Sequence, residues 1–325
     1  MTKVLGMGNA LVDVLAVIEN DKILELLQLP KGSMQLIDET KLEIISEEIN
    51  KLNKSIVSGG SASNTIVGLA NLDVETGFLG RIGTDFYGTY YKEDLKKHRV
   101  ASHLTEVNEA SGVASTFISK DGERTFGTYL GAAALLHADE LDANDFKGYD
   151  YFYIEGYLVQ SHDLIKKAIV LAKEAGAKII LDMASYNVVE ANRDFLLEII
   201  PLYVDIVFAN EEEAKALFDL EPEEAVSEIA KQVGIAIVKT GEKGSWIQRG
   251  NEKVFVPALK VNCVDTTGAG DLYAAGFIYG LINNCPLSAC GRIGTLLAGN
   301  VIEAIGAKIE ENKWSQLHQE IKKLI

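Results

Sequence analysis

Four segments decide the fold, YFYIEG (151–156), AKIILDM (177–183), VDIVFAN (204–210) and GIAIVKT (234–240), and each is apolar almost throughout. Segments with helical apolar spacing, such as residues 162–175 and 190–200, separate several of them. A strand that is apolar on both sides is buried on both faces, which is typical of a parallel sheet covered by helices. The sequence therefore predicts an α/β fold with a central, mostly parallel sheet flanked by helices.

The same alternation continues toward the N-terminus. KVLGMG (3–8) and VETGFLG (74–80) are predicted strands, and residues 39–53 have the apolar spacing of a helix. Residues 110–131 differ, because Thr, Phe and Val alternate with polar residues around a Lys-Asp-Gly turn. This pattern predicts a hairpin with one exposed face, and residues 12–19 are expected to pair near it.

The chain has no internal repeat and no shift in composition that would divide it. We therefore expect a single domain over residues 1–325. Strands inserted into a parallel α/β domain suit a small β-sheet lid, which we expect from about residues 11–38 and 105–131.

Composition narrows the class of protein. The 325 residues are 47% apolar, which suits a sizeable core, and 47 acidic residues against 31 basic ones give a net charge of -16. Such a surface repels phosphate backbones and anionic lipid, so nucleic acids and membranes are not expected partners. The three cysteines, Cys263, Cys285 and Cys290, have no CxxC spacing, so neither a disulfide framework nor a structural zinc site is expected. Because Asn9 and Asp13 interrupt the apolar N-terminus, we predict a first strand rather than a signal peptide, and a cytoplasmic protein.

The segment CVDTTGAGDLYAAGFIYGLINN (263–284) carries the clearest chemical signal. A strand is expected to end at Val264, followed by a run of small residues and an apolar helix that begins near Asp271. Small residues at a helix start let backbone N–H groups approach an anion, and the helix dipole favours negative charge there. Asp271 then suits a base that takes a proton from an attacking hydroxyl, although it could also simply cap its helix. No GxxxxGK[ST] motif is present, and GMGNAL (6–11) lacks the third glycine of a dinucleotide fingerprint.

DTTGAGD (265–271) closely resembles the C-terminal signature of the ribokinase-like (PfkB) kinases, while SGGSASNTIVGLANL (58–72) and GFLGRIGTDFYG (77–88) resemble their N-terminal signature. The likeness covers essentially the whole chain. Within the family, GNALVDV (8–14), KGSMQLID (31–38), DGERTFGTYLGAA (121–133) and residues 181–214 are most similar to adenosine kinases. The resemblance implies transfer of the γ-phosphoryl group of ATP, with Mg²⁺, to a CH₂OH group of a sugar or nucleoside.

The resemblance also implies roles for the residues of the reacting centre. Asp271 would be the base, and Gly268, Ala269 and Gly270 would form an anion hole for the transferring phosphoryl group. Arg124 aligns with a lid arginine that would neutralise phosphoryl charge on closure. From the hairpin pattern alone, Arg124 is equally an arginine of a solvated turn.

Five residues match sugar contacts of the family. Asp13 matches an acidic residue that binds ribose hydroxyls, and Asn9, Gly59, Gly60 and Asn64 match further contacts. A carboxylate suits two vicinal hydroxyls, because charge-assisted hydrogen bonds are about twice as strong as neutral ones. Without the resemblance, Asp13 is an ordinary residue at a strand end, the glycines form a turn, and Asn64 is an exposed polar residue in a helix.

On the nucleotide side, VKTGEKGS (238–245) matches a loop near the ATP phosphates and ribose. The resemblance assigns Lys239, Thr240, Gly241 and Gly244 to that loop, and Asn300 to the border of the adenine. The alternative for the loop is a tight turn between two strands, and for Asn300 a polar residue in a helix.

Asn210 and Glu213, in ANEEEA (209–214), match the family's NxxE element, which is associated with Mg²⁺ and phosphate positioning. Because Mg²⁺ keeps most of its waters, this influence is expected to act through water. Asn followed three residues later by Glu, between a strand and a helix, is also a helix capping box, and both roles can hold together. A monovalent cation such as K⁺ is a further possible cofactor.

Two segments depart from animal adenosine kinases. KGSM (31–34) replaces a more polar sequence that meets the purine, and IEGYLVQ (154–160) replaces an aromatic-rich one. We predict phosphorylation of the 5′-hydroxyl of a ribonucleoside, with adenosine favoured and a monomeric or homodimeric protein. The alternatives are a kinase of ribose, fructose or 2-keto-3-deoxygluconate, and a nucleoside or sugar sensor without catalysis.

Overall fold

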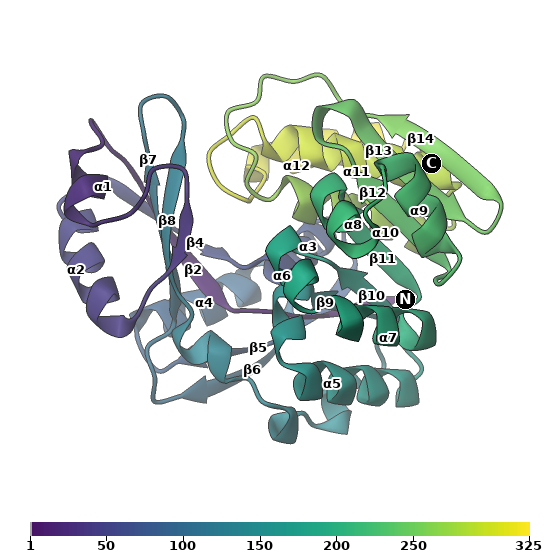
Figure 1. Cartoon of the computed structure of the whole chain (residues 1–325), viewed down its shortest axis with the longest axis horizontal. Coiled ribbons are helices and arrows are strands. Elements are labelled where there is room, and N and C mark those ends of the chain that lie inside the picture. Colours follow the sequence, from purple (N-terminus) through teal and green to yellow (C-terminus); the bar gives the residue numbers. More distant parts are fainter. Residues whose placement is uncertain (1) are drawn as a thin grey trace.

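Two β-sheets of unequal size organise the protein, whose computed structural model describes residues 2–325 (Figure 1). The larger sheet has nine strands, in the spatial order β14 (Glu252–Pro257), β13 (Gly244–Arg249), β12 (Ile235–Lys239), β11 (Ile206–Asn210), β10 (Lys178–Asp182), β9 (Tyr151–Glu155), β1 (Lys3–Met7), β5 (Glu75–Gly83) and β6 (Ala101–Val107). Strands β12, β13 and β14 pair antiparallel, and the other neighbours pair parallel. The predicted α/β fold is confirmed, and the four apolar segments are the adjacent strands β9 to β12.

Helices cover both faces of the larger sheet, which is why its strands are apolar on both sides. One face is covered by α3 (Ser61–Asn71), α4 (Phe86–Lys97), α10 (Ala269–Ile282), α11 (Leu287–Val301) and α12 (Trp314–Ile321). The other is covered by α5 (His162–Glu174), α6 (Tyr186–Ala191), α7 (Arg193–Tyr203), α8 (Glu211–Phe218) and α9 (Pro222–Ala230). Short 3₁₀ helices join the elements at Gly131–Leu135, Ala138–Glu140, Ala143–Phe146, Gly156–Gln160, Gly241–Lys243 and Glu311–Lys313.

The smaller sheet stands beside the larger body, at the left of Figure 1. Its five strands lie in the order β3 (Met34–Leu36), β8 (Arg124–Tyr129), β7 (Gly112–Ile118), β2 (Leu11–Val17) and β4 (Lys54–Gly59). The helices α1 (Lys22–Leu26) and α2 (Glu39–Ile49) pack on its outer face around Phe117 and Val14. Its inner face is therefore free to look toward the larger body.

The structure differs from the sequence-based expectation in two places near this sheet. Residues 105–107 belong to β6 of the larger sheet, where Thr105 pairs with Arg81, and the smaller sheet instead takes in β4. The strand expected to end at Val264 does not form. The N–H groups of Val264 and Asp265 donate to the carbonyl of Ile302, so a loop-to-helix contact replaces a ladder.

Among residues 2–325, no helix combines the length and apolar character that crossing a membrane requires.

Candidate functional site

The candidate site lies where the parallel strands end. From β1 the chain builds the sheet outward through β5 and β6, then returns to β9 on the other side and continues through β10 to β12. Ligands bind at the carboxyl ends of strands at such a reversal of strand order. The ends of the four apolar strands carry Glu155, Asp182, Asn210 and Lys239. The topology thus gathers charged side chains from distant segments at one edge.

Asp271 lies in the first turn of α10 and is held by two donors from α3. The Ser61 hydroxyl donates to its Oδ1 at 2.7 Å, and the Asn64 amide donates to its Oδ2 at 2.9 Å. Burial raises the pKa of Asp271 to about 6, against the lowering effect of these two hydrogen bonds. A carboxylate that is fixed in place and is ionised at neutral pH suits a general base.

The start of α10 presents backbone N–H groups that have no acceptor in the described part of the chain. Gly268 precedes the helix in the left-handed conformation, with φ of 76°, which favours glycine. Among residues 2–325, no acceptor is found for the N–H groups of Gly268, Gly270 and Asp271, whereas the N–H of Ala269 donates to the carbonyl of Thr266 at 3.2 Å. Free N–H groups at a helix start form an anion site. Gly268 and Gly270 thus have free donors here, and Ala269 does not.

Arg124, on β8 of the smaller sheet, reaches the loop before α10. Its guanidinium forms an ion pair with the buried Asp265 and donates to the Thr267 hydroxyl at 2.7 Å. Burial lowers the pKa of Arg124, and Asp265 opposes that effect. The interpretation of Arg124 as a solvated turn residue is wrong, because this contact joins the smaller sheet to the loop before α10, beside the anion site.

Asp13 lies on the inner face of β2, opposite Val57 of β4. Among the described residues no donor bonds to its carboxylate, and a Cβ on Gly59 would lie 2.4 Å from its Oδ2. Burial raises the pKa of Asp13 to about 7, and Lys308 opposes this rise. A half-buried carboxylate without a protein donor can accept hydrogen bonds from ligand hydroxyls.

Asn9 turns toward the protein interior. Its side-chain amide donates to Glu155 at 2.8 Å, and the same carboxylate accepts from the backbone of Ala62 at 3.0 Å. Burial raises the pKa of Glu155 to about 7. Gly60, at the start of α3, has φ of 89°, and a Cβ there would lie 2.2 Å from the carbonyl oxygen of Asn9. This close packing fixes the start of the helix that supports Asp271.

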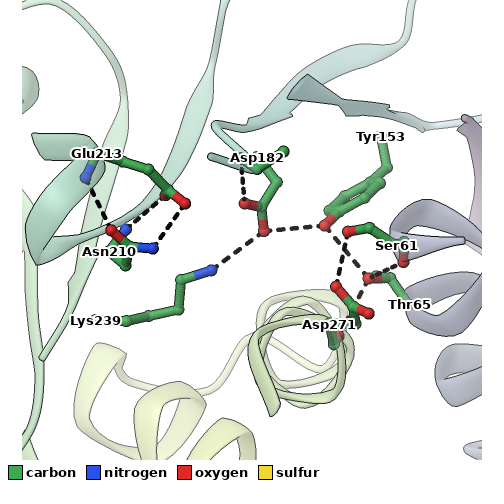
Figure 2. Close-up of polar contacts among 9 residues, drawn as sticks. Ser61, Thr65, Tyr153, Asp182, Asn210, Glu213, Lys239 and Asp271 are labelled. Carbon is green, nitrogen blue, oxygen red and sulfur yellow. Dashed lines mark hydrogen bonds and ion pairs between the residues drawn. The ribbon is translucent and has the colours of Figure 1, made fainter. Parts of the chain in front are cut away.

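Asp182 and Lys239 form a buried ion pair between the strand ends and α10 (Figure 2). The Lys239 ammonium lies 3.3 Å from Asp182 Oδ2, and the Tyr153 hydroxyl donates to the same oxygen at 3.1 Å. The Thr65 hydroxyl lies 3.3 Å from the Tyr153 hydroxyl and 3.1 Å from the backbone oxygen of Asp271, and it can donate its single proton to either. Burial lowers the pKa of Lys239, but Asp182 and two further carboxylates outweigh it and leave that pKa above its usual value.

Asn210 and Glu213 form the expected capping box at the start of α8. Asn210 Oδ1 accepts from the Glu213 backbone at 2.8 Å, and Glu213 accepts from the backbone and the side chain of Asn210, both at 2.7 Å. Because both carboxylate oxygens are engaged, Glu213 fits an action on a cation through water rather than direct ligation. Residues 2–325 contain no group of three or more His, Cys, Asp or Glu side chains placed to hold a metal ion.

The sequence and the fold have counterparts in known proteins. Residues 34–314 match the pfkB family carbohydrate kinases. The chain belongs to the PfkB family. An adenosine kinase from Sinorhizobium meliloti is 33% identical with a TM-score of 0.87, covering 98% of this chain and 99% of that one. A probable sugar kinase from Rhizobium etli CFN 42 is 32% identical with a TM-score of 0.89, covering 100% and 99%. Adenosine kinase 2 of Arabidopsis thaliana is 26% identical, covering 94% of this chain and 95% of that protein.

Family membership fixes the type of reaction. This PfkB protein is a phosphotransferase that uses an alcohol group as acceptor, and the fold is ribokinase-like. The family implies ATP and typically Mg²⁺. The names of its relatives include both adenosine kinases and sugar kinases, so they leave the acceptor of this PfkB kinase open.

The remaining residues predicted to bind the nucleotide lie in the turn after β12 and on α11. Thr240, Gly241 and Gly244 form a tight turn between β12 and β13, closed by the Thr240 N–H donating to the Gly244 carbonyl at 2.7 Å. Asn300, on α11, donates to the carbonyl of its own helix at Leu296, at 2.9 Å.

Three exposed apolar residues surround the C-terminal end of α11. Leu259 packs on Gly299, the neighbour of Asn300, and the N–H of Val264 donates to the carbonyl of Ile302. Ile305 follows Ile302 by three residues in the chain. Leu259, Val264 and Ile305 expose between 44% and 49% of their surface. Such a patch beside a polar side chain suits a flat apolar ring.

Sequence reasoning missed several residues of this site, chiefly Ser61, Glu155, Asp182 and Lys308. Glu155 and Asp182 follow directly on two of the predicted strands, so the rule that parallel strands end at one edge would have found them. Nothing local marks Lys308, which bonds to Ser58 and Asp94 across the chain. Asn64 is buried, contrary to its interpretation as an exposed polar residue.

Proposed function

We propose that this kinase transfers the γ-phosphoryl group of ATP to the 5′-hydroxyl of a ribonucleoside, with adenosine as the favoured acceptor. One observation carries the choice of a nucleoside over a free sugar. The inner face of the smaller sheet bears an apolar surface directly beside Asp13.

Strand register defines that surface. Residues paired across neighbouring strands point to the same face, and alternate residues of one strand do so as well. Asp13 therefore shares its face with a row that lies two residues further along β2, made of Leu15, Thr116, Phe126 and Met34. Leu36 extends the Asp13 row itself.

The exposure of this face is unusual for apolar residues. Met34 exposes 51% and Leu36 exposes 63% of its surface, and Phe126 is half-buried, although the opposite face of the sheet is closed by α2. Leu15 and Thr116 are buried, so the exposed part of the face is the side of β3 and β8. Arg124 lies on the same face and contacts the loop before α10, so the face looks toward Asp271. A ribose held at Asp13 would place its base against the apolar row, whereas a free sugar would leave that row uncovered.

The chemistry follows from the residues at the start of α10. Asp271 takes the proton of the 5′-hydroxyl while its oxygen forms a bond to the γ-phosphorus, and the bond to the departing ADP oxygen breaks. The free N–H groups of Gly268 and Gly270 stabilise the charge of the transferring group. Arg124 donates to the hydroxyl of Thr267, the neighbour of Gly268, and would contribute by exchanging Asp265 for the phosphoryl oxygens.

Two features support ATP as the phosphoryl donor. Lys239 suits the phosphates, and the exposed apolar residues Leu259, Val264 and Ile305 near Asn300 suit the adenine. Mg²⁺ would neutralise phosphate charge, with Glu213 acting on it through water. Direct coordination by Glu213 would require the capping box with Asn210 to open. A K⁺ requirement, a monomeric or homodimeric state and a cytoplasmic location remain predictions.

The proposal is tested by ADP release with ATP and Mg²⁺ against adenosine, inosine, guanosine, ribose, fructose and 2-keto-3-deoxygluconate. We expect adenosine to give the highest kcat/KM, by about tenfold or more over any free sugar, because burying a base against an apolar row adds at least 1.4 kcal/mol. Turnover confined to a free sugar would keep the mechanism and replace the acceptor. If no acceptor released ADP, nucleoside binding without turnover would favour the sensor alternative.

Asp13→Asn is expected to raise KM for the nucleoside by about 10- to 100-fold, because hydrogen bonds to a charged acceptor are worth about 1.5–3 kcal/mol. The ionised carboxylate is the better acceptor, and its pKa of about 7 makes the wild-type KM fall as pH rises from 6 to 8. Steady-state kinetics over that range should show this dependence in wild type and not in Asp13→Asn. An unchanged KM at pH 8 in the variant would remove Asp13 from the acceptor site.

A further inference from the structure

We propose that Asp182 is a positioning residue for phosphoryl transfer, which holds the Lys239 ammonium against the anion site at Gly270. This inference rests on the proposed function and adds a residue to it. Asp182 is carried by β10 and Lys239 by β12, with β11 between them, so the pair spans three strand ends. In Figure 2 the Lys239 side chain extends from its strand toward Asp182, beside the start of α10.

The position of the ammonium is the first argument. A Cβ on Gly270 would lie 3.2 Å from Lys239 Nζ, so the ammonium lies directly beside the backbone whose N–H is free. Any larger residue at position 270 would push the charge away. Lys239 therefore adds a full positive charge at the place where the helix start offers partial ones.

The unused donors of Lys239 are the second argument. An ammonium has three N–H donors, and within residues 2–325 its one hydrogen-bond acceptor is Asp182 Oδ2, at 3.3 Å. The side chain is only 16% exposed, and the ammonium lies 6.0 Å from the centroid of the Phe208 ring. A buried ammonium with free donors costs free energy unless a ligand supplies acceptors, and phosphate oxygens are suitable ones.

The attachment of Asp182 is the third argument. Its side chain is 6% exposed, and Oδ2 accepts from both Lys239 and the Tyr153 hydroxyl. The Thr65 hydroxyl lies within hydrogen-bond distance of both Tyr153 and the backbone oxygen of Asp271, so Thr65 holds the tyrosine beside the first turn of α10. A buried ion pair is weak evidence for stability, since apolar replacements often stabilise as well. We infer that the Asp182–Lys239 pair instead fixes the position of the Lys239 ammonium.

The test compares Asp182→Asn, Lys239→Met and the double variant. We expect each single variant to lower kcat by about 10- to 100-fold, with KM for the acceptor within about twofold of wild type. If Asp182 acts through Lys239, the double variant is no slower than Lys239→Met alone. Losses that multiply in the double variant would overturn the proposal.

Asp205→Asn is the matched control. Asp205 lies at the opposite edge of the same sheet, where it pairs with Lys173 at 2.6 Å and accepts from the Ile179 backbone at 2.7 Å. This variant also removes a carboxylate from an aspartate–lysine pair of the larger sheet. We expect no change in kcat, so a loss equal to that of Asp182→Asn would indicate a structural effect only.

A second readout separates positioning from mere support of the fold. Asp182 raises and Lys239 lowers the pKa of Asp271, so Asp182→Asn should move the acid limb of the kcat profile to lower pH and Lys239→Met to higher pH. The charged and titratable groups facing Asp271 are Asp13, Tyr153, Glu155, Tyr157, Asp182 and Lys239. Of these groups, Asp182→Asn and Lys239→Met change only Asp182 and Lys239. Unmoved limbs in both variants would contradict the proposal.

A measurement that needs no turnover tests the role of Asp182 separately from the proposed kinase activity. Carboxyl ¹³C NMR of the ligand-free protein, assigned with Asp271→Asn, follows the titration of Asp271 in each variant. If the wild-type protein released no ADP, the proposed function would fail. The Asp271 pKa should still fall in Asp182→Asn and rise in Lys239→Met, and this comparison would still test how Asp182 and Lys239 are arranged around Asp271. If Asp182→Asn does not fold, Tyr153→Phe replaces it, because this variant removes a hydrogen-bond donor to Asp182. We expect Tyr153→Phe to lower kcat by about 3- to 10-fold in the wild-type background and not to lower it further in the Lys239→Met background.

Discussion

Asp271→Asn is expected to lower kcat by about 10³-fold or more, because no other described carboxylate occupies the start of α10 to take the proton of the attacking hydroxyl. The fold should persist. The introduced amide keeps an oxygen for the Ser61 donor, and Asn64 can rotate its amide so that its buried Oδ1, which has no partner in this structure, accepts instead. Coupled-assay kinetics and thermal unfolding of the same preparation check both statements.

The pH profile of the wild type belongs to the same prediction. The base must be ionised, and burial raises the pKa of Asp271 to about 6. The kcat should therefore be full above pH 7 and fall as pH drops through about 6, which is the direction expected for a carboxylate whose charged form is active. Near-normal turnover in Asp271→Asn, or a kcat independent of pH between 5 and 7, would remove Asp271 from this role.

Gly268→Ala is expected to lower kcat by about 10²-fold. The residue has φ of 76°, and an added Cβ would lie 2.7 Å from the Cα of Ala307, which is backbone and cannot move aside cheaply. The loop before α10 must therefore shift, which misplaces the free N–H groups of Gly268 and Gly270. Loss of one such donor typically costs about 10²- to 10³-fold in kcat.

Gly148→Ala is the matched control for Gly268→Ala. Gly148 has φ of 81°, and a Cβ there meets nothing within 4 Å. Both substitutions carry the backbone strain of a left-handed residue, about 1–3 kcal/mol, and should lower Tm for that reason. Only Gly268→Ala should lower kcat, as measured at a temperature well below both transitions. Equal kcat values for the two variants would mean that the α10 start does not bind the transferring group.

Local patterns made much of the fold predictable. Apolar runs such as residues 177–183 and 234–240 signal burial on both faces, because burial is a property of each segment. The small residues before Asp271 were equally readable, since the geometry of a helix start depends on a few neighbouring residues. The strand expected to end at Val264 failed because a contact with Ile302, 38 residues away, decided its conformation.

Contacts between site residues that are distant in the sequence could not be predicted from local patterns. The hairpin pattern allows a solvated Arg124, but Asp265 lies 141 residues further along the chain and meets Arg124 only when the smaller sheet faces the loop before α10. Likewise, β4 belongs to the smaller sheet because it pairs with β2, and no local pattern in residues 54–59 predicts this pairing. Strand order and sheet orientation set these contacts, and both are global properties of the chain.

The sequence by itself therefore determined the α/β class, the two signature motifs and the residue types available for phosphoryl transfer, because each depends on short stretches of chain. The tertiary structure decided which charges meet. It placed Asp182 against Lys239, left Asp13 without a donor among the described residues and brought Arg124 of the smaller sheet to Asp265 in the loop before α10. Electrostatic energy depends on distances in space, and the order in which strands assemble fixes those distances.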